Sequence, residues 1–332
     1  MTAVLITGAT GFLGYHVLAA LRTAGVEAHA LVRDLAAWPR DWAAELGNVT
    51  RVPGSPIDAT TWPARGSYRA IVHAAGIVAH TRSDPAEMIR VNVEGARAAI
   101  RAAARLGARA ILISSSGTVG CFAHPAVTAD EHAPFAEALV ARWPYYASKI
   151  RAEREARDLA TRLGVELSIV RPPVLLGPHD HRQRSTGHVA RVLAGRVPFI
   201  PSGGMHFTDV RDAAAAIARM TLRPTVRSIY HLPGTASSLA EFFAAVGEVS
   251  GVQVPARRAP AWLLHSVARA TGRVAIPHVP DPVVLEMATR FWGLSTLWSH
   301  TELDYAPRAA RQTLSDTVSW LRAQTQAHPR AA

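Results

Sequence analysis

Short hydrophobic runs alternate with longer helix-like stretches over the first two-thirds of this chain. The short runs predict strands at Val4–Thr7, Ala28–Val32, Ala70–His73, Ala110–Ser114 and Leu167–Arg171. The longer stretches predict helices at Phe12–Thr23, Pro85–Leu106 and Tyr145–Leu163. Hydrophobic strands that are separated by helices are typical of a parallel sheet covered on both faces. The pattern therefore predicts an α/β fold with a doubly wound parallel sheet.

The first predicted strand ends in a glycine-rich turn that opens the first predicted helix. The turn consists of Gly8, Ala9, Thr10, Gly11, Phe12, Leu13 and Gly14. Glycines at this spacing allow a tight turn and a close backbone approach to a pyrophosphate, and the helix N-terminus attracts the anion. Because the turn lies between a strand and a helix, it predicts a dinucleotide-binding, Rossmann-type domain rather than an ordinary glycine-rich turn.

The end of the second predicted strand bears on the choice of nucleotide. An acidic residue there would hydrogen-bond the adenosine ribose, but this chain has Val32 followed by Arg33. A guanidinium suits the 2′-phosphate of NADP(H), so we expect NADP(H) to be preferred over NAD(H). The alternative is that Arg33 is only a solvated turn residue. Asp34 comes one residue later and is expected to point elsewhere.

Two further segments are predicted to border the cofactor. His73-Ala74-Ala75-Gly76 ends a predicted strand with small residues, which let the backbone lie against the adenosine ribose. Asp58 is expected to lie near the adenine or, equally, to cap a short helix, as an aspartate before Ala-Thr-Thr often does.

The alternation of strands and helices stops after residue 171, at two turns that contain proline. A strand-helix-strand unit returns later, and the remainder is mostly helical. We therefore predict an NADP-binding Rossmann domain and a smaller, mostly helical, C-terminal substrate-binding region. The predicted boundaries are 1–171 with 205–232 for the Rossmann domain, 172–204 and 233–325 for the substrate-binding region, and 326–332 for a flexible tail.

Composition bears on the compartment. The chain has 332 residues, of which 49% are hydrophobic, enough to form a substantial core. It contains no run of about 18 apolar residues, so we expect neither a transmembrane helix nor a signal peptide. The single cysteine, Cys121, cannot form an internal disulfide, which fits a reducing compartment. We therefore expect a soluble cytoplasmic protein without a membrane partner.

The net charge of +11 raises the question of a nucleic-acid partner. The arginines are scattered along predicted helices instead of forming one basic tract with interleaved aromatic residues, so we expect no nucleic-acid binding. A positive surface favours an anionic cofactor or substrate, and the plain alternative is a solvated arginine-rich surface. No histidine in the C-terminal helices has a neighbour at metal-ligand spacing, so we predict no metal.

Lys149 is the only lysine among the 36 lysines and arginines of the chain, and it follows Tyr145 by four residues. At this spacing both side chains project from one face of a helix. An ammonium beside a phenol lowers the pKa of the phenol, and it can hold ribose hydroxyls where a wider guanidinium cannot. The run Ser114-Ser115-Ser116 supplies a hydroxyl that could polarise a carbonyl. The pattern predicts a catalytic tyrosine–lysine pair; the alternative is a buried aromatic pair, Tyr145-Tyr146, beside a polar loop.

Through these motifs, the chain resembles the extended short-chain dehydrogenase/reductase family over nearly its whole length. The matching segments are Gly8-x-x-Gly11-x-x-Gly14, His73-Ala-Ala-Gly76, Asn92-Val-Glu-Gly95, the serine run, Tyr145-x-x-x-Lys149, Arg171-Pro-Pro and Phe207-Thr-Asp209-Val-Arg-Asp212. The resemblance implies that Tyr145 is the general acid/base and that Lys149 is its partner. It implies that Ser116 is the catalytic hydroxyl, with Ser115 as the alternative. Asn92 either helps to order the site or only anchors its helix.

The resemblance also implies further contacts. Ser114, Tyr145 and Lys149 should contact the cofactor through their side chains. The backbone at Pro172 and Val174 should lie against the nicotinamide. A homodimer through the helices at 85–106 and 145–163 is a further implication.

The reaction type is open to argument within this family. Gly117 and Thr118 stand where dehydratases usually carry acidic residues, and Val174 stands where sugar-nucleotide epimerases often carry asparagine. Residues 171–178 look more like dihydroflavonol-4-reductase-like and 3β-hydroxysteroid-dehydrogenase-like proteins. We therefore expect an NADPH-dependent reductase acting on a ketone or aldehyde of a small, apolar or polycyclic metabolite. The alternatives are a nucleotide-sugar or related sugar epimerase without net cofactor turnover, and a noncatalytic NADP-sensing protein.

Overall fold

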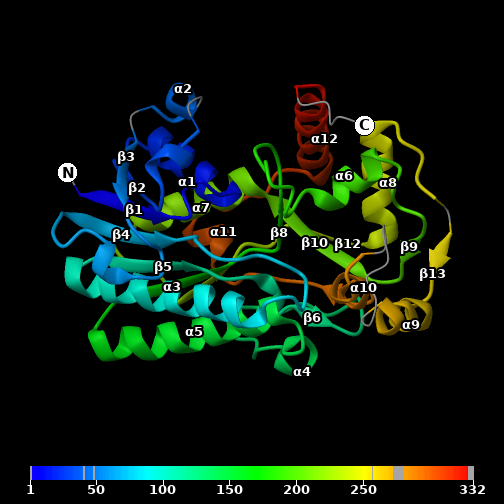
Figure 1. Cartoon of the computed structure of the whole chain (residues 1–332), viewed down its shortest axis with the longest axis horizontal. Coiled ribbons are helices and arrows are strands. Elements are labelled where there is room, and N and C mark those ends of the chain that lie inside the picture. The colour runs from blue at the N-terminus through cyan, green and yellow to red at the C-terminus, as the bar shows by residue number, and fades with distance from the viewer. Residues whose placement is uncertain (1, 40–41, 48, 256, 272–279, 328–332) are drawn as a thin grey trace.

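A computed structural model of the chain describes residues 2–39, 42–47, 49–255, 257–271 and 280–327 (Figure 1). Within these residues, seven parallel strands form the central sheet. They are β1 (Ala3–Thr7), β2 (Ala28–Val32), β3 (Thr50–Pro53), β4 (Tyr68–His73), β5 (Arg109–Ile113), β7 (Leu167–Arg171) and β11 (Ile229–His231). Their order across the sheet is β11-β7-β5-β4-β1-β2-β3. The chain therefore winds outward in both directions from the neighbouring strands β1 and β4.

Helices cover both faces of this sheet, as Figure 1 shows. The helices on one face are α1 (Phe12–Thr23), α2 (Trp42–Leu46) and α7 (Val210–Leu222), and those on the other are α3 (Pro85–Leu106) and α5 (Pro144–Leu163). Alternate residues of β1 supply the two cores: Val4 and Ile6 pack with α1 and α7, while Leu5 packs with α3 and α5. This arrangement confirms the predicted doubly wound α/β fold.

The remaining elements gather mainly at one end of the molecule (Figure 1). They include three small sheets. In the first, β10 (Gly204–Asp209) lies between β8 (Val174–Leu176) and β12 (Thr235–Ser238). The other two are the pairs β9 (Ile200–Pro201) with β13 (Arg258–Ala259) and β6 (Cys121–Phe122) with β14 (Phe291–Trp292). The helices are α4 (Glu137–Val140), α6 (Gly187–Leu193), α8 (Leu239–Ser250), α9 (Ala261–Thr271), α10 (Pro282–Met287), α11 (Ser299–Glu302) and α12 (Ala310–Ala327). Single 3-10 turns are η1 (Leu35–Ala37), η2 (Ala59–Thr61) and η3 (Ser116–Thr118).

The described structure differs from the sequence predictions at element ends and at the sheet edge. β5 ends at Ile113, so Ser114 follows the strand instead of closing it. β3 was not predicted, because it is an edge strand whose side chains are mostly exposed and therefore lack a hydrophobic run. Residues 205–232 were predicted to return to the main domain. Only α7 and β11 of this segment do so, whereas β10 pairs with β8 and β12 in a separate sheet.

The end of the chain also differs in part from its prediction. α12 continues to Ala327, so residues 326 and 327 of the predicted tail are helical. Residues 328–332 of that tail lie outside the described residues. No helix in the described part of the chain is long and apolar enough to span a bilayer.

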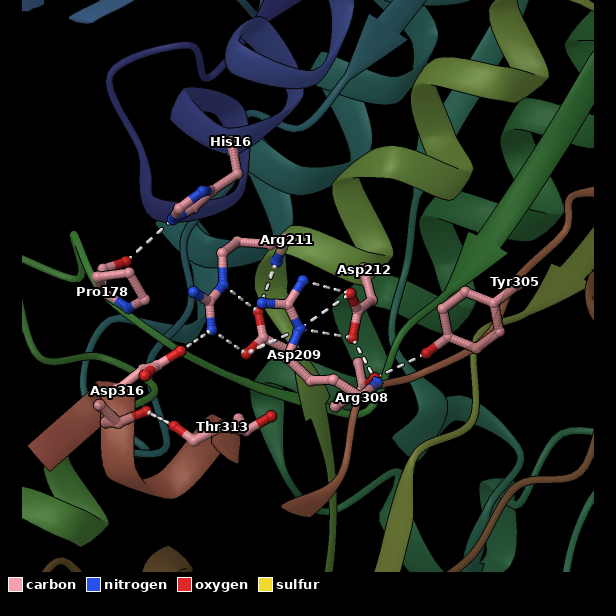
Figure 2. Close-up of polar contacts among 11 residues, drawn as sticks. His16, Pro178, Asp209, Arg211, Asp212, Tyr305, Arg308, Thr313 and Asp316 are labelled. Carbon is pink, nitrogen blue, oxygen red and sulfur yellow. Dashed lines mark hydrogen bonds and ion pairs between the residues drawn. The ribbon is translucent and has the colours of Figure 1, made fainter. Parts of the chain in front are cut away.

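A cluster of ion pairs joins the C-terminal segment to the start of α7 (Figure 2). Arg211 forms a two-pronged contact with the Asp209 carboxylate, at 2.8 and 2.7 Å, and also reaches Asp316 of α12 at 2.6 Å. Arg308 holds Asp212 in the same way, with contacts of 2.7 to 3.1 Å. Planar guanidinium–carboxylate pairs of this kind fix orientation as well as distance. The cluster therefore fastens the C-terminal helix to a helix that packs on the central sheet.

Candidate active site

The predicted site residues follow the carboxyl ends of three neighbouring strands. Gly8 follows β1, Ala74 follows β4 and Ser114 follows β5. These strands lie side by side in the order β5-β4-β1, at the point from which the sheet is wound in opposite directions. Ligands of doubly wound sheets bind at such a point, beyond the carboxyl ends of the strands. The sheet topology therefore brings together motifs that are more than 100 residues apart in the sequence.

The glycine-rich turn forms a close cradle at the start of α1. A Cβ atom on Gly8 would lie 2.6 Å from the Ala74 carbonyl carbon, and one on Gly14 would overlap the Gly8 carbonyl oxygen. Gly8 also has a φ of 70°, which favours glycine. The N-cap of α1 is Gly11, which has no side chain to cap the helix, and the first turn carries no acidic residue. These features fit a phosphate group, because no side chain of the described residues accepts a hydrogen bond from the first amides of α1.

His73 holds the end of β4 against β1 instead of presenting a side chain to the surface. Its Nδ1 is 2.8 Å from Thr7 Oγ1, and the same hydroxyl accepts the Ala75 amide at 3.2 Å. Burial and the nearby charge of Lys149 lower the pKa of His73 to about 3. The neutral, buried imidazole thus positions the backbone of Ala74 and Ala75 beside Gly8.

Asn92 connects the loop after β4 with α5. Its Oδ1 accepts the Ile77 amide at 2.8 Å, and its Nδ2 donates to the Ile77 carbonyl at 3.1 Å and to Ser148 Oγ at 2.8 Å. A Cβ atom on Gly76 would lie 2.8 Å from Asn92 Oδ1 and 3.7 Å from Lys149 Nζ. Asn92 therefore orders the loop against the helix that carries Tyr145 and Lys149.

The residues predicted to border the adenosine part of the cofactor occupy exposed turns. Arg33 is exposed at the end of β2 and makes no hydrogen bond or ion pair with any residue that the structure describes. The Asp34 side chain accepts a hydrogen bond from the Ala36 amide at 2.8 Å and so caps η1. Asp58 caps η2 by accepting the Thr60 amide at 3.0 Å, which matches the capping alternative.

Tyr145 and Lys149 lie in the first two turns of α5, where Tyr145 is buried and Lys149 is half-buried. Lys149 Nζ donates to the Ile113 carbonyl at 2.9 Å. Burial lowers the pKa of Lys149 to about 8, and the charge of Glu153 opposes this effect. Burial also raises the pKa of Tyr145 to about 12, although a hydrogen bond with the Ser115 side chain lowers it. The sequence predicted a lowered pKa for this phenol, but the pKa is raised, because burial disfavours the charged phenolate.

The serine run places its hydroxyls in different surroundings. Ser114 is buried and donates to the Glu153 carboxylate at 2.5 Å. The Ser115 side chain hydrogen-bonds Tyr145 and accepts the Gly117 amide at 3.3 Å. Ser116 is anchored through its backbone amide, which donates to the Pro172 carbonyl at 2.9 Å. The structure thus brings Ser115 to the Tyr145 phenol, where the family resemblance favoured Ser116.

Two of the predicted cofactor contacts lie just after β7. Pro172 is buried, and its carbonyl is the acceptor for the Ser116 amide. Val174 is half-buried and begins β8, which pairs with β10. Both residues therefore belong to the segment that runs alongside the serine run.

A buried ion pair beneath the site was missed by the sequence reasoning. The Glu153 carboxylate accepts two hydrogen bonds from Arg171, from Nε at 3.0 Å and from one terminal nitrogen at 2.6 Å. Burial raises the pKa of the Glu153 carboxyl, but the Arg171 guanidinium and the Ser114 hydroxyl outweigh this, so that pKa lies below its usual value. The available signal was the position of Glu153, four residues after Lys149 and therefore on the same helix face.

Several known proteins are similar to this chain in sequence or in structure. The model of the NAD dependent epimerase/dehydratase family matches residues 4–231. A putative dihydroflavonol 4-reductase of Synechocystis sp. is 27% identical over 331 residues, covering 95% of this chain and 93% of that protein. Cinnamoyl-CoA reductase 1 of Oryza sativa subsp. japonica is 30% identical over 262 residues, covering 74% of this chain and 75% of that protein. The crystal structure of gox2253 superposes with a TM-score of 0.84 and 30% identity, covering 98% of this chain and 99% of that one.

Proposed function

This chain belongs to the NAD dependent epimerase/dehydratase family, and we propose that it is an NADPH-dependent reductase of ketone or aldehyde carbonyls. The observation that carries the proposal is the buried Tyr145 phenol, which lies beside Ser115 and one helical turn before the half-buried Lys149. The names of two relatives, a putative dihydroflavonol 4-reductase and a cinnamoyl-CoA reductase, support reduction. Apolar side chains around Tyr145 and Tyr146 favour a small, apolar or polycyclic substrate.

The reduced nicotinamide, when bound, supplies the hydride to the carbonyl carbon. Tyr145 then gives its proton to the carbonyl oxygen, and its raised pKa keeps it protonated until that step. We assign to Ser115 the hydrogen bond that holds the carbonyl oxygen, with Ser116 as the alternative. The Lys149 ammonium stabilises the phenolate that Tyr145 becomes and holds the ribose hydroxyls.

The residues that would hold the cofactor are those of the predicted set. The Gly8–Gly14 turn would hold the pyrophosphate, and the backbone at 73–76 would lie along the adenosine ribose. Arg33 would pair with the 2′-phosphate, and Asp58 lies in the neighbouring turn. Pro172 and Val174 would border the nicotinamide.

Replacing Arg33 with alanine is expected to weaken the binding of NADPH but not that of NADH. A charge-assisted contact with the 2′-phosphate would be lost, so the KM for NADPH should rise by about 10- to 100-fold while that for NADH stays unchanged. Steady-state kinetics with each cofactor measure this, with Arg51→Ala, an exposed arginine of β3, as the matched control. Equal losses with both cofactors would count against 2′-phosphate recognition by Arg33.

Reduction is expected to slow at alkaline pH because Lys149 loses its proton. The pKa of Lys149 is about 8 in the folded protein, so the ammonium is present below that pH and disappears above it. The kcat/KM for reduction should therefore be level from pH 6 to pH 7 and fall above about pH 8. In Lys149→Arg the guanidinium keeps its proton, so the lower residual activity should show no such fall. A wild-type profile that stays level to about pH 10 would contradict this role.

The direct test is loss of near-ultraviolet NADPH absorbance with the purified protein and a panel of ketones, aldehydes and nucleotide sugars. Steady oxidation with a carbonyl compound, faster with NADPH than with NADH, is the expected result. Retention of a tightly bound cofactor without net oxidation, together with conversion of a sugar, would replace the proposal with the epimerase alternative. That alternative is favoured by the exposed Arg182 and Arg184 after β8, which are free to contact a diphosphate.

A further inference from the structure

A histidine outside the predicted site lies directly against the Tyr145 ring. His80 belongs to the loop between β4 and α3. Its ring meets the Tyr145 ring edge-on, with centroids 5.4 Å apart and an interplanar angle of 89°. It is stacked on Tyr146, with centroids 6.0 Å apart and an angle of 29°. His80 is therefore a neighbour of the group that donates the proton in the proposed reaction.

One nitrogen of this ring has no hydrogen-bond partner among the residues that the structure describes. The Nδ1 atom of His80 is buried and makes no hydrogen bond with the described residues. The side chains packed around the two tyrosines are largely apolar and include Met88, Val283 and Met287, which offer no strong hydrogen bond. Leaving a buried polar atom unpaired costs free energy, so such an atom beside a reacting group points to a partner that arrives with the substrate.

The surroundings keep this imidazole neutral. Burial lowers the pKa of His80 to about 4, and Asp281 at the start of α10 opposes this. Burial also lowers the pKa of His188, in α6, to about 4. A neutral imidazole nitrogen accepts or donates a hydrogen bond according to its tautomer, so Nδ1 can pair with a hydroxyl as well as with a carbonyl oxygen.

We propose that His80 is a specificity-determining residue whose Nδ1 hydrogen-bonds a second oxygen of the substrate, close to the carbonyl that is reduced. The proposal rests on the proposed reductase function and narrows its substrate class to carbonyl compounds with a neighbouring hydroxyl, such as α-hydroxy ketones. The contact between the His80 and Tyr145 rings requires the two substrate oxygens to be close together. A ketone without the second oxygen would leave Nδ1 without a hydrogen bond in the complex. The site should therefore discriminate against such a ketone.

The test compares two ketones that differ only in this hydroxyl, 2-hydroxyacetophenone and acetophenone. The wild type should prefer the hydroxyketone by about tenfold in kcat/KM, the effect of one hydrogen bond. His80→Phe keeps a ring against both tyrosines and should abolish the preference by lowering the value for the hydroxyketone alone. His80→Asn, whose amide can occupy the place of Nδ1, should restore part of it. His80→Leu serves as the second variant if His80→Phe does not fold, as judged by circular dichroism.

A binding measurement decides the role of His80 without turnover. Quenching of tryptophan fluorescence should report binding of 1-phenyl-1,2-ethanediol and 1-phenylethanol to the NADP⁺-loaded protein. Trp292 is close to the proposed site, because its ring centroid lies 5.4 Å from that of Tyr146. The diol should bind the wild type more tightly and lose this advantage in His80→Phe. Equal affinities in the wild type, or equal loss for both ketones in His80→Phe, would overturn the proposal. Absence of all ketone reduction would count against the reductase, and the diol comparison would then decide on His80 by itself.

Discussion

The Tyr145→Phe variant is expected to lose about 100- to 10,000-fold in kcat for carbonyl reduction. The phenol is the acidic group that the structure holds beside Ser115, and its pKa of about 12 keeps it protonated at neutral pH. Phenylalanine retains the ring that contacts His80 and Tyr146, so the packing around it should persist. The measurement is kcat at saturating ketone, with the dissociation constant for NADPH determined in parallel and expected to be unchanged.

Two serine variants separate the alternatives for the carbonyl-binding hydroxyl. Ser115→Ala should reduce kcat by about 100-fold, the usual effect of losing one positioned donor, because Ser115 hydrogen-bonds Tyr145. Ser116→Ala is the matched control and should be close to wild type, since Ser116 is anchored through its backbone amide. The opposite ranking would give the role to Ser116, and full activity of Tyr145→Phe would refute the mechanism altogether.

The parts of the site that could be predicted from sequence are those encoded within one element or one turn. The glycine-rich turn and the Tyr145–Lys149 pair depend only on spacing along a strand-turn-helix or a helix face, and the structure places them as expected. Asp58 is a similar case, because its capping of η2 involves a residue only two positions away. Local chemistry of this kind needs no knowledge of the tertiary fold.

The choice among the three serines could not be predicted, because it depends on how the chain turns after β5. The backbone enters η3 at Ser116, which directs Ser114 to Glu153 and Ser115 to Tyr145. The pKa of Tyr145 was predicted in the wrong direction for a related reason. Spacing showed the nearby ammonium, but only the packed structure shows how completely the phenol is buried.

The largest effect on stability is expected from Glu153→Ala, which should lower the free energy of unfolding by about 3 to 5 kcal/mol. Glu153 and Arg171 are both almost fully buried, and Arg171 would keep its charge after its partner is removed. The two residues come from α5 and β7 and meet because α5 lies against the sheet beside β7. Urea unfolding at neutral pH measures the change. Glu155→Ala provides the control, because Glu155 lies on the same helix and its two ion pairs, with Arg151 and Arg97, are partly exposed and should each contribute less than about 1 kcal/mol.

A double variant tests whether the loss comes from the unpaired charge. Glu153→Leu combined with Arg171→Met removes both charges and keeps apolar volume, so it should be more stable than Glu153→Ala alone. The single variants Glu153→Leu and Arg171→Met complete the comparison. If the loss of unfolding free energy in the double variant equals the sum of the losses in these two, the residues contribute through independent contacts, such as those of Glu153 with Ser114 and of Arg171 with Phe135. A loss in the double variant that is smaller than this sum is the expected result. It would mean that the ion pair fixes the position of α5, and with it Tyr145 and Lys149, at the ends of β5 and β7.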